Sequence, residues 1–182
     1  MLKYISLYKQ LVDFHPNSLY LITSSNDKTI RLWALESGAC VRLIYNYTSK
    51  AYIDCLAFTG NGKILAIACD NCIILYDLVK MGDPIRIVDE FTSKSIYSLA
   101  FDNEDNVLVV STQDHNILFY DLHSLLNDDL SLKINGKEES SYLNIISSYF
   151  TKKTSIMTMK FTASNILLLL GRFDDNDPKI FM

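Results

Sequence analysis

The sequence predicts an all-β fold in which small four-stranded sheets pack side by side around an axis, the arrangement called a β-propeller. Three observations predict it: an internal repeat, the same order of strands and turns within each repeat, and a composition that favours strands. A period of about 40 to 45 residues with one aromatic residue per period is typical of propeller blades. The repeat is the most informative of the three, because its period selects one architecture among the all-β folds.

The repeat is visible when the chain is compared with itself. Three segments resemble one another: "VDFHPNSLYLITSSNDKTIRLWAL" (12–35), "LAFTGNGKILAIACDNCIILYDL" (56–78) and "LAFDNEDNVLVVSTQDHNILFYDL" (99–122). Two sets of aromatic residues keep the same step of 43 or 44 residues, namely Phe14, Phe58 and Phe101, and Trp33, Tyr76 and Tyr120. A fourth unit is predicted over 159–173. It follows a polar insertion at about 123–148 and precedes an acidic tail at 174–182.

The composition is that of a soluble β protein. With 182 residues, 49% hydrophobic and 21% charged, the chain can bury a core and is too charged to lie in a membrane. Eleven Tyr and nine Phe favour strands, and three Pro leave them largely uninterrupted. The net charge of -4 gives no general attraction to nucleic acid. We expect one domain that makes no membrane contact, and no export signal is visible at the start of the sequence.

Within each unit the pattern indicates strands separated by tight turns. Ile30 and Leu32 alternate with Thr29, Arg31 and Trp33, as in a strand with two different faces. The segments "HPNS" and "TGNG" are predicted first turns. Second turns contain an aspartate, which readily binds nearby backbone in tight turns; these residues are Asp27, Asp70 and Asp114. The segments "ESGACVRLIY" and "VKMGDPIRIV" then predict a turn and an outer strand, which gives four strands per unit.

The endings of the units carry a resemblance. They read Trp33-Ala34, Tyr76-Asp77 and Tyr120-Asp121, and the sequence in this respect resembles the WD-repeat family, whose units end in Trp-Asp or a near variant. The family's Gly-His pair is replaced here by "YNYTSK", "DEFTSK" and "SYFTKK". The family's tetrad of His, Ser or Thr, Asp and Trp is thus only partly filled, by Thr23, Asp27 and Trp33. The resemblance implies a structural role for nine positions: Thr23, Asp27, Trp33, Asp70, Tyr76, Asp77, Asp114, Tyr120 and Asp121.

Three further features resemble the WD-repeat subunits of the general transcription factor TFIID, which yeasts share with the SAGA coactivator. "SGACVRL" follows the first repeat, a polar insertion follows the third repeat's "YDL", and the terminal unit contains "SYFTKKT", similar to the family's closing Tyr-Thr-Lys-Lys-Thr element. The resemblance covers about Val12 to Phe173. It implies a nuclear, non-catalytic scaffold that supports assembly of the RNA polymerase II preinitiation complex. The implied partners are other TFIID or SAGA subunits, especially histone-fold subunits, with an indirect link to TATA-binding protein and promoter DNA.

The number of repeats departs from that family. Its propeller has seven blades, whereas the repeats here account for about three and a half to four. Half a ring exposes an unpaired strand edge and an apolar blade face. Three alternatives stay open: the chain is part of a longer protein, a separate polypeptide supplies the missing blades, or four blades close a small ring.

Catalysis, metal binding and cofactor binding are not expected. The pair Cys69 and Cys72 lacks the second pair of ligands that a zinc site needs, which leaves both as ordinary thiols of a strand or turn. "TGNGK" lacks the helix of a phosphate-binding loop, and "DDND" lacks the Gly and Glu of a calcium loop. No nucleophile motif surrounds the Ser, His and Asp residues. The sequence therefore predicts a protein without a small-molecule substrate.

Surface residues for partner contact are predicted in two places. One is the polar insertion, for which a solvated loop is the competing interpretation. The other is the pair Lys152 and Lys153 in "YFTKKT". The rival function is that of a WD-repeat adaptor in another assembly, such as a ubiquitin-ligase receptor or an RNA-processing scaffold. Such an adaptor does not need the "YFTKKT" closing unit.

Overall fold

The structure is a computed structural model that describes residues 11–25, 27–45, 53–69, 72–80, 84–88, 95–123 and 145–173. Its regular structure consists of antiparallel strands grouped in four sheets. Sheet A contains β1 (Leu11–Phe14), β2 (Tyr20–Ser24), β3 (Thr29–Ala34) and β4 (Cys40–Tyr45). Sheet B contains β5 (Ile53–Phe58), β6 (Ile64–Cys69), β7 (Cys72–Asp77) and β8 (Arg86–Val88). Sheet C contains β9 (Ile96–Phe101), β10 (Val107–Thr112), β11 (Asn116–Asp121) and β12 (Ile145–Phe150), and sheet D contains β13 (Thr154–Phe161) and β14 (Leu167–Phe173).

Sheets A, B and C have the four strands that the repeat predicts, in chain order from the inner to the outer strand. The fold class, a partial β-propeller, is confirmed. One boundary differs from the sequence interpretation. Ile145 and the three residues after it were assigned to the polar insertion, yet they begin β12, the outer strand of sheet C. The remainder of that insertion, 124–144, and the acidic tail lie outside the described residues.

The core lies between neighbouring sheets, because each sheet has an apolar face on both sides. Between sheets A and B, Ile22 and Ile30 pack with Leu65 and Ile67. A second cluster joins sheets B and C, and a third joins sheets C and D. All six residues of β6 are buried, since sheet B is covered on both faces. Burial on two faces explains why β6 reads as the continuous apolar run "ILAIAC" instead of an alternating one.

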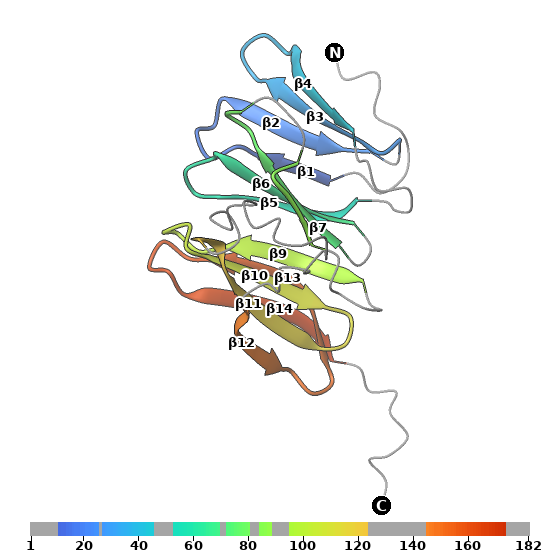
Figure 1. Ribbon diagram of the computed structural model, residues 1–182, viewed down its shortest axis with the longest axis vertical. Coiled ribbons are helices and arrows are strands. Elements are labelled where there is room, and N and C mark those ends of the chain that lie inside the picture. The colour runs from blue at the N-terminus through green and yellow to red at the C-terminus, as the bar shows by residue number, and fades with distance from the viewer. Residues whose placement is uncertain are drawn as a thin grey trace, which may run out of the picture.

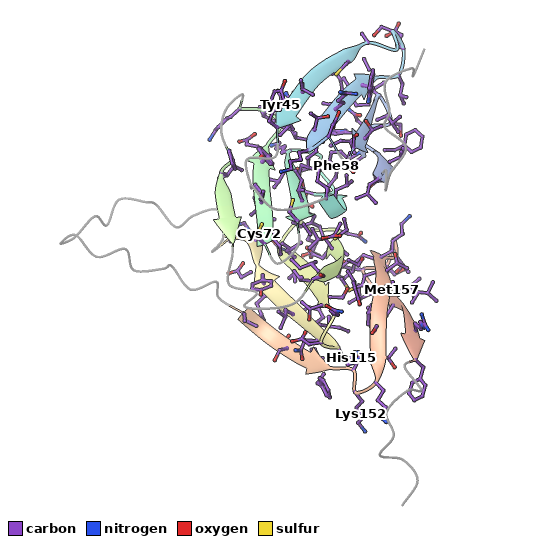
Figure 2. The ribbon with its side chains drawn as sticks, turned by 90° about the vertical axis from the view of Figure 1, so that its right-hand side faces the viewer. Tyr45, Phe58, Cys72, His115, Lys152 and Met157 are labelled. Carbon is purple, nitrogen blue, oxygen red and sulfur yellow. The ribbon has the colours of Figure 1, made fainter. Side chains whose placement is uncertain are left out.

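The sheets follow one another along an arc. Figure 1 shows β1–β4 at one end of the long axis and β13–β14 near the other, and Figure 2 shows the same succession from the side. The inner strands β1, β5, β9 and β13 are successive neighbours. Among the described residues, sheets A and D therefore do not meet, and the four sheets form an open arc.

We expect Leu65→Ala to lower the free energy of unfolding by about 2 to 5 kcal/mol, because the change leaves a cavity between two sheets. Leu65 is 0% exposed, whereas Leu19, the matched control, is 62% exposed. Urea unfolding of the Leu65→Ala and Leu19→Ala variants measures the difference. Equal midpoints in the two variants would contradict the packing of sheet B on sheet A.

Candidate protein-interaction surface

The first repeat contains part of the side-chain network that the sequence indicated. The indole Nε1 of Trp33 donates a hydrogen bond to Thr23 Oγ1 at 2.9 Å. Strand pairing places Trp33 opposite Leu21, so Thr23 lies two residues further along β2 on the same face. This bond ties the end of β3 to the middle of β2. It fixes the aromatic side chain on the face of sheet A that points away from sheet B.

Asp27 organises the turn between β2 and β3. Its carboxylate accepts hydrogen bonds from the backbone N–H of Thr29 at 2.9 Å and from the Thr29 hydroxyl at 2.6 Å. The Arg31 guanidinium lies 3.2 Å from the same carboxylate. Burial raises the pKa of Asp27, but the hydrogen bonds from Thr29 and Ser25 and the charge of Arg31 together hold that pKa below its ordinary value of 3.8.

The remaining markers divide into buried aromatics and turn residues. Tyr76 and Tyr120 are buried in the cores that join sheets A to B and B to C, respectively. Tyr76 Oη also donates to the backbone carbonyl of Tyr45 at 3.3 Å, which links β7 to the end of β4. Aspartates that follow the aromatics bind the next turn. Asp77 accepts from the N–H groups of Val79 and Lys80, and Asp121 accepts from the N–H of His123.

In the second turn of the third repeat the aspartate binds the threonine two residues before it, whereas Asp27 of the first repeat binds Thr29, two residues after it. Asp114 accepts a hydrogen bond from the hydroxyl of Thr112, so its carboxylate binds a side chain of its own turn. Asp70, the marker of the second repeat, lies outside the described residues. The described positions among them bind their own turns or pack in the core. Their contacts shape the turns.

The connection from β12 to β13 is short and tightly bound. It comprises Thr151, Lys152 and Lys153. The backbone N–H and the hydroxyl of Thr151 both donate to the carbonyl of His115, at 2.8 and 2.9 Å. Ser155 Oγ lies 3.2 Å from His115 Nδ1. Figure 2 shows His115 and Lys152 at the same end of the molecule, where β12 turns into β13.

Lys152 is exposed and Lys153 is half-buried at this connection. Lys152 has a φ of 55°, a left-handed conformation that the surrounding hydrogen bonds hold in place. Sequence reasoning selected both lysines but missed His115 and Thr151, which position them. In the sequence, the "TKK" motif was the feature that indicated this connection. Its partner, 36 residues earlier at His115, is not marked by any periodic pattern.

At the opposite end of the strands, the first turns of the four sheets form a turn ladder. Each of these turns contains a residue with a positive φ. The four residues are Ser18, Gly62, Asp105 and Asn165. These turns bind one another in succession. His15 Nε2 lies 2.9 Å from the Gly62 carbonyl, and Asp105 accepts from the backbone N–H groups of Gly60 and Asn61.

The last step of the turn ladder joins sheets C and D, where the Asn103 N–H donates to Asn165 Oδ1 at 3.1 Å. Position 62 requires a glycine, because a Cβ there would come within 2.3 Å of the His15 ring. The turn ladder therefore fixes the relative position of all four sheets at one edge. Sequence analysis had located two of these turns without predicting their contacts.

The four inner strands line a groove of about 840 Å³. Its lining mixes charged and apolar residues, including Asp54, Lys160 and Met157, the last of which is 51% exposed. Within the described residues, no group of three or more His, Cys, Asp or Glu is placed to hold a metal ion. Over the same part of the chain no helix is long and apolar enough to cross a membrane. Cys69 and Cys72 are buried at the facing ends of β6 and β7, and the Cys72 thiol donates to the Cys69 carbonyl at 3.3 Å.

This arrangement is suited to holding another protein. The turn ladder fixes the four sheets at one edge, and the Thr151–His115 contact binds the β12–β13 connection to sheet C at the other. The turns and the groove are thus presented in set positions. Rigid presentation lowers the entropy that is lost when a partner binds. Lys152 and Lys153 lie on the edge opposite the turn ladder.

Comparison with known proteins identifies the repeats. The family "WD domain, G-beta repeat" (WD40) matches residues 11–34, 38–77 and 82–121, more than half of the chain. Transcription initiation factor TFIID subunit 5 of Caenorhabditis elegans is 29% identical over 168 residues, which cover 89% of this chain and 25% of that protein. A ribosome biogenesis protein BOP1 homolog of Drosophila ananassae is 31% identical over 78 residues, 42% of this chain and 9% of that protein.

A third relative is pre-mRNA-processing factor 19 homolog 2 of Arabidopsis thaliana. It is 29% identical over 101 residues, which cover 56% of this chain and 18% of that protein. The chain thus spans a quarter or less of the length of these three relatives.

We expect Thr151→Val to destabilise the connection by about 1 kcal/mol, because the change removes the hydroxyl bond to His115 while keeping the side-chain shape. Hydrogen exchange at the Thr151 and Thr154 amides should quicken, together with a small drop in melting temperature. Thr158→Val, at an exposed threonine of β13, is the matched control. Unchanged exchange in Thr151→Val would show that the hydroxyl does not hold the connection.

Asp27 should make stability depend on pH. Its folded-state pKa is lowered, so the stabilising contribution is fully present above its ordinary pKa of 3.8 and is lost as the pH falls through the folded value. We expect Asp27→Asn to lower the melting temperature at pH 7 and to have a smaller effect as the pH falls below about 4. Melting curves of both proteins across this range measure the effect. A constant difference between them at every pH would contradict the assignment to Asp27.

Proposed function

The chain belongs to the WD40-repeat family, and we propose that it acts as a non-catalytic scaffold subunit of a TFIID-type transcription initiation complex. WD40-repeat proteins are in general non-catalytic scaffolds for protein–protein interaction, and a propeller offers broad faces and turn edges for that role. What remains to be proposed is the assembly in which the scaffold works. We infer the identity of that assembly from parts of the chain that lie outside the common repeat.

The observation that carries the proposal is the extent of similarity to the TFIID subunit. The WD40 match ends at residue 121, whereas the similarity to TFIID subunit 5 covers 89% of a 182-residue chain. That coverage extends beyond the last matched repeat. The later part of the chain includes the Thr151–Lys153 connection and sheet D, where the resemblance to the closing element of that family lies. The BOP1 and pre-mRNA-processing relatives cover only 42% and 56% of the chain.

Two lysines of the β12–β13 connection support the proposal of a partner contact there. Lys152 is exposed at a tight turn, and Lys153 follows it on the connection that His115 holds. We infer that this edge contacts acidic surfaces of histone-fold subunits. Through them the chain is linked to TATA-binding protein and promoter DNA, in TFIID and, in yeasts, in SAGA as well. Neither catalysis nor a cofactor is part of this function.

A nuclear location belongs to the same proposal. The names of the three relatives concern transcription initiation, ribosome biogenesis and pre-mRNA processing, all of which take place in the nucleus. The second candidate function follows from the latter two names. A scaffold of an RNA-processing assembly would use the same repeats, and only its partners would differ.

We would test the function by tagging the C-terminus of the natural protein and purifying it under native conditions. Mass spectrometry would identify the bound proteins and the length of the tagged chain. Recovery of TATA-binding protein together with histone-fold subunits is the expected result. Recovery of ribosome-biogenesis or splicing proteins in their place would favour the second candidate and contradict the first.

The contribution of the lysines can be tested in the same purification. Lys152→Glu with Lys153→Glu should lower the recovery of histone-fold subunits several-fold, because the charge of the contact edge is reversed. Lys63→Glu with Lys80→Glu makes the same charge change at exposed lysines outside that connection. If the two double variants retain partners equally, the lysines do not form the contact.

A further inference from the structure

One outer strand of the arc, β12, presents an apolar edge. Four of its six residues are large, hydrophobic and exposed: Ile145 (49%), Ile146 (58%), Tyr149 (59%) and Phe150 (65%). Within the part of the chain that the structure describes, β12 pairs with β11 alone, and Figure 1 shows it at the margin of sheet C. Sheet C has sheet B on one side and sheet D on the other. The exposure of β12 therefore does not arise at an end of the arc.

The backbone of β12 offers hydrogen-bonding groups along its outer edge. Thr151 directly follows the strand, and its N–H donates to the carbonyl of His115, just before β11. Because successive N–H groups of a strand point to its two edges in alternation, the N–H of Tyr149 also points toward β11, whereas those of Ser148 and Phe150 point outward. The register shift between these two strands lies before these residues and does not disturb the alternation. Two N–H groups of β12 are thus directed toward a further strand.

The outer strands of the other two four-stranded sheets are less suited to receive a strand. Natural sheets protect an outer strand by making it short or by placing a charged residue or a proline on it. β8 has only three residues. β4 contains Arg42, whose Nη1 donates to the Leu78 carbonyl of sheet B at 2.7 Å. β12 reads "IISSYF", with neither a charged residue nor a proline, and it therefore lacks these protections.

A positive charge lies at the carboxyl end of β12. Lys152 is exposed two residues after the strand, in a turn closed by a hydrogen bond from the Thr154 N–H to the Thr151 carbonyl. Antiparallel strand pairs are slightly more stable per residue than parallel ones, and an antiparallel strand added to β12 would begin at this end. An acidic residue near its start would meet Lys152. Charge complementarity therefore favours both an acidic segment and this direction of the added strand.

We propose that β12 is a docking edge for an extended segment of a partner protein, which adds to sheet C as a further, antiparallel strand. The backbone of the segment binds the outward groups of Ser148 and Phe150, and its alternate apolar side chains pack beside Ile145 and Phe150. An acidic residue at its amino-terminal end binds Lys152. This docking edge goes beyond the proposed function and applies to either candidate assembly, because it depends on the strand and the adjacent charge and not on the identity of the complex.

The probe is a fluorescein-labelled synthetic peptide that begins with Glu-Asp and continues with three Val-Thr pairs. Fluorescence anisotropy measures its binding to the purified natural protein, and hydrogen exchange locates the contact. We expect binding, with slower exchange at the Ser148 and Phe150 amides and a smaller change at the Tyr149 amide, which points toward β11. A probe with the Glu-Asp pair moved to its carboxyl end should bind several-fold more weakly, because the acidic residues then lie far from Lys152.

Two changes test the edge itself. Ser148→Pro removes an outward N–H and no bond to β11, so the sheet should persist while the probe binds about tenfold more weakly. Probe methylated on its backbone nitrogens gives the same test without altering the protein. Phe150→Asp should also weaken binding, whereas Leu43→Asp, at an exposed residue of the outer strand β4, should not.

Three results would overturn the proposal: a natural protein that does not bind the probe, equal binding of the methylated probe, or a Ser148→Pro variant that binds as tightly as the natural protein.

Discussion

The fold depends on one constraint: a small sheet with apolar residues on both faces is stable only when neighbouring sheets cover both of them. Sheet B is covered on both faces, since every residue of β6 is buried between sheets A and C. Sheet D shows the opposite case, because six of the seven residues of β14 are exposed. The arrangement of all four sheets follows from this need for cover. The turns and connections then determine how far each sheet is rotated from the previous one.

Most of the fold could be predicted because its signals are local. Alternating residues, tight-turn residues and one aromatic per period all lie within a single repeat, so the strands of sheets A and B followed from the sequence. β12 was assigned in part to an insertion, because it is separated from β11 by a long polar segment and has two serines at its centre. The bond between Trp33 and Thr23 joins two positions of one repeat, and both positions had been selected. The bond between Thr151 and His115 joins the β12–β13 connection to a turn 36 residues earlier, and no local pattern specifies it.

The features that distinguish this chain from a generic WD40 protein gather where sheet C passes to sheet D. There the family's Gly-His pair is replaced by a short connection whose backbone is bound by the carbonyl of His115. A connection held in this way gives Lys152 a defined position although the residue lies on the surface. Function in this family depends on such surface positions, because the interior of the propeller is occupied by packing. The repeats therefore identify the family, whereas the proposed partner contact lies on the connection.

The turn ladder has a consequence for how the chain can evolve. His15 requires a glycine at position 62, and the carboxylate of Asp105 serves the backbone of Gly60 and Asn61. The backbone N–H of Asn103 donates a hydrogen bond to the side-chain oxygen of Asn165. Each repeat is thus fitted to the one that follows it, so a change in one of these turns alters the fit of its neighbour. Duplication or loss of a whole repeat would bring mismatched turns together, and the repeats are therefore similar in shape without being interchangeable.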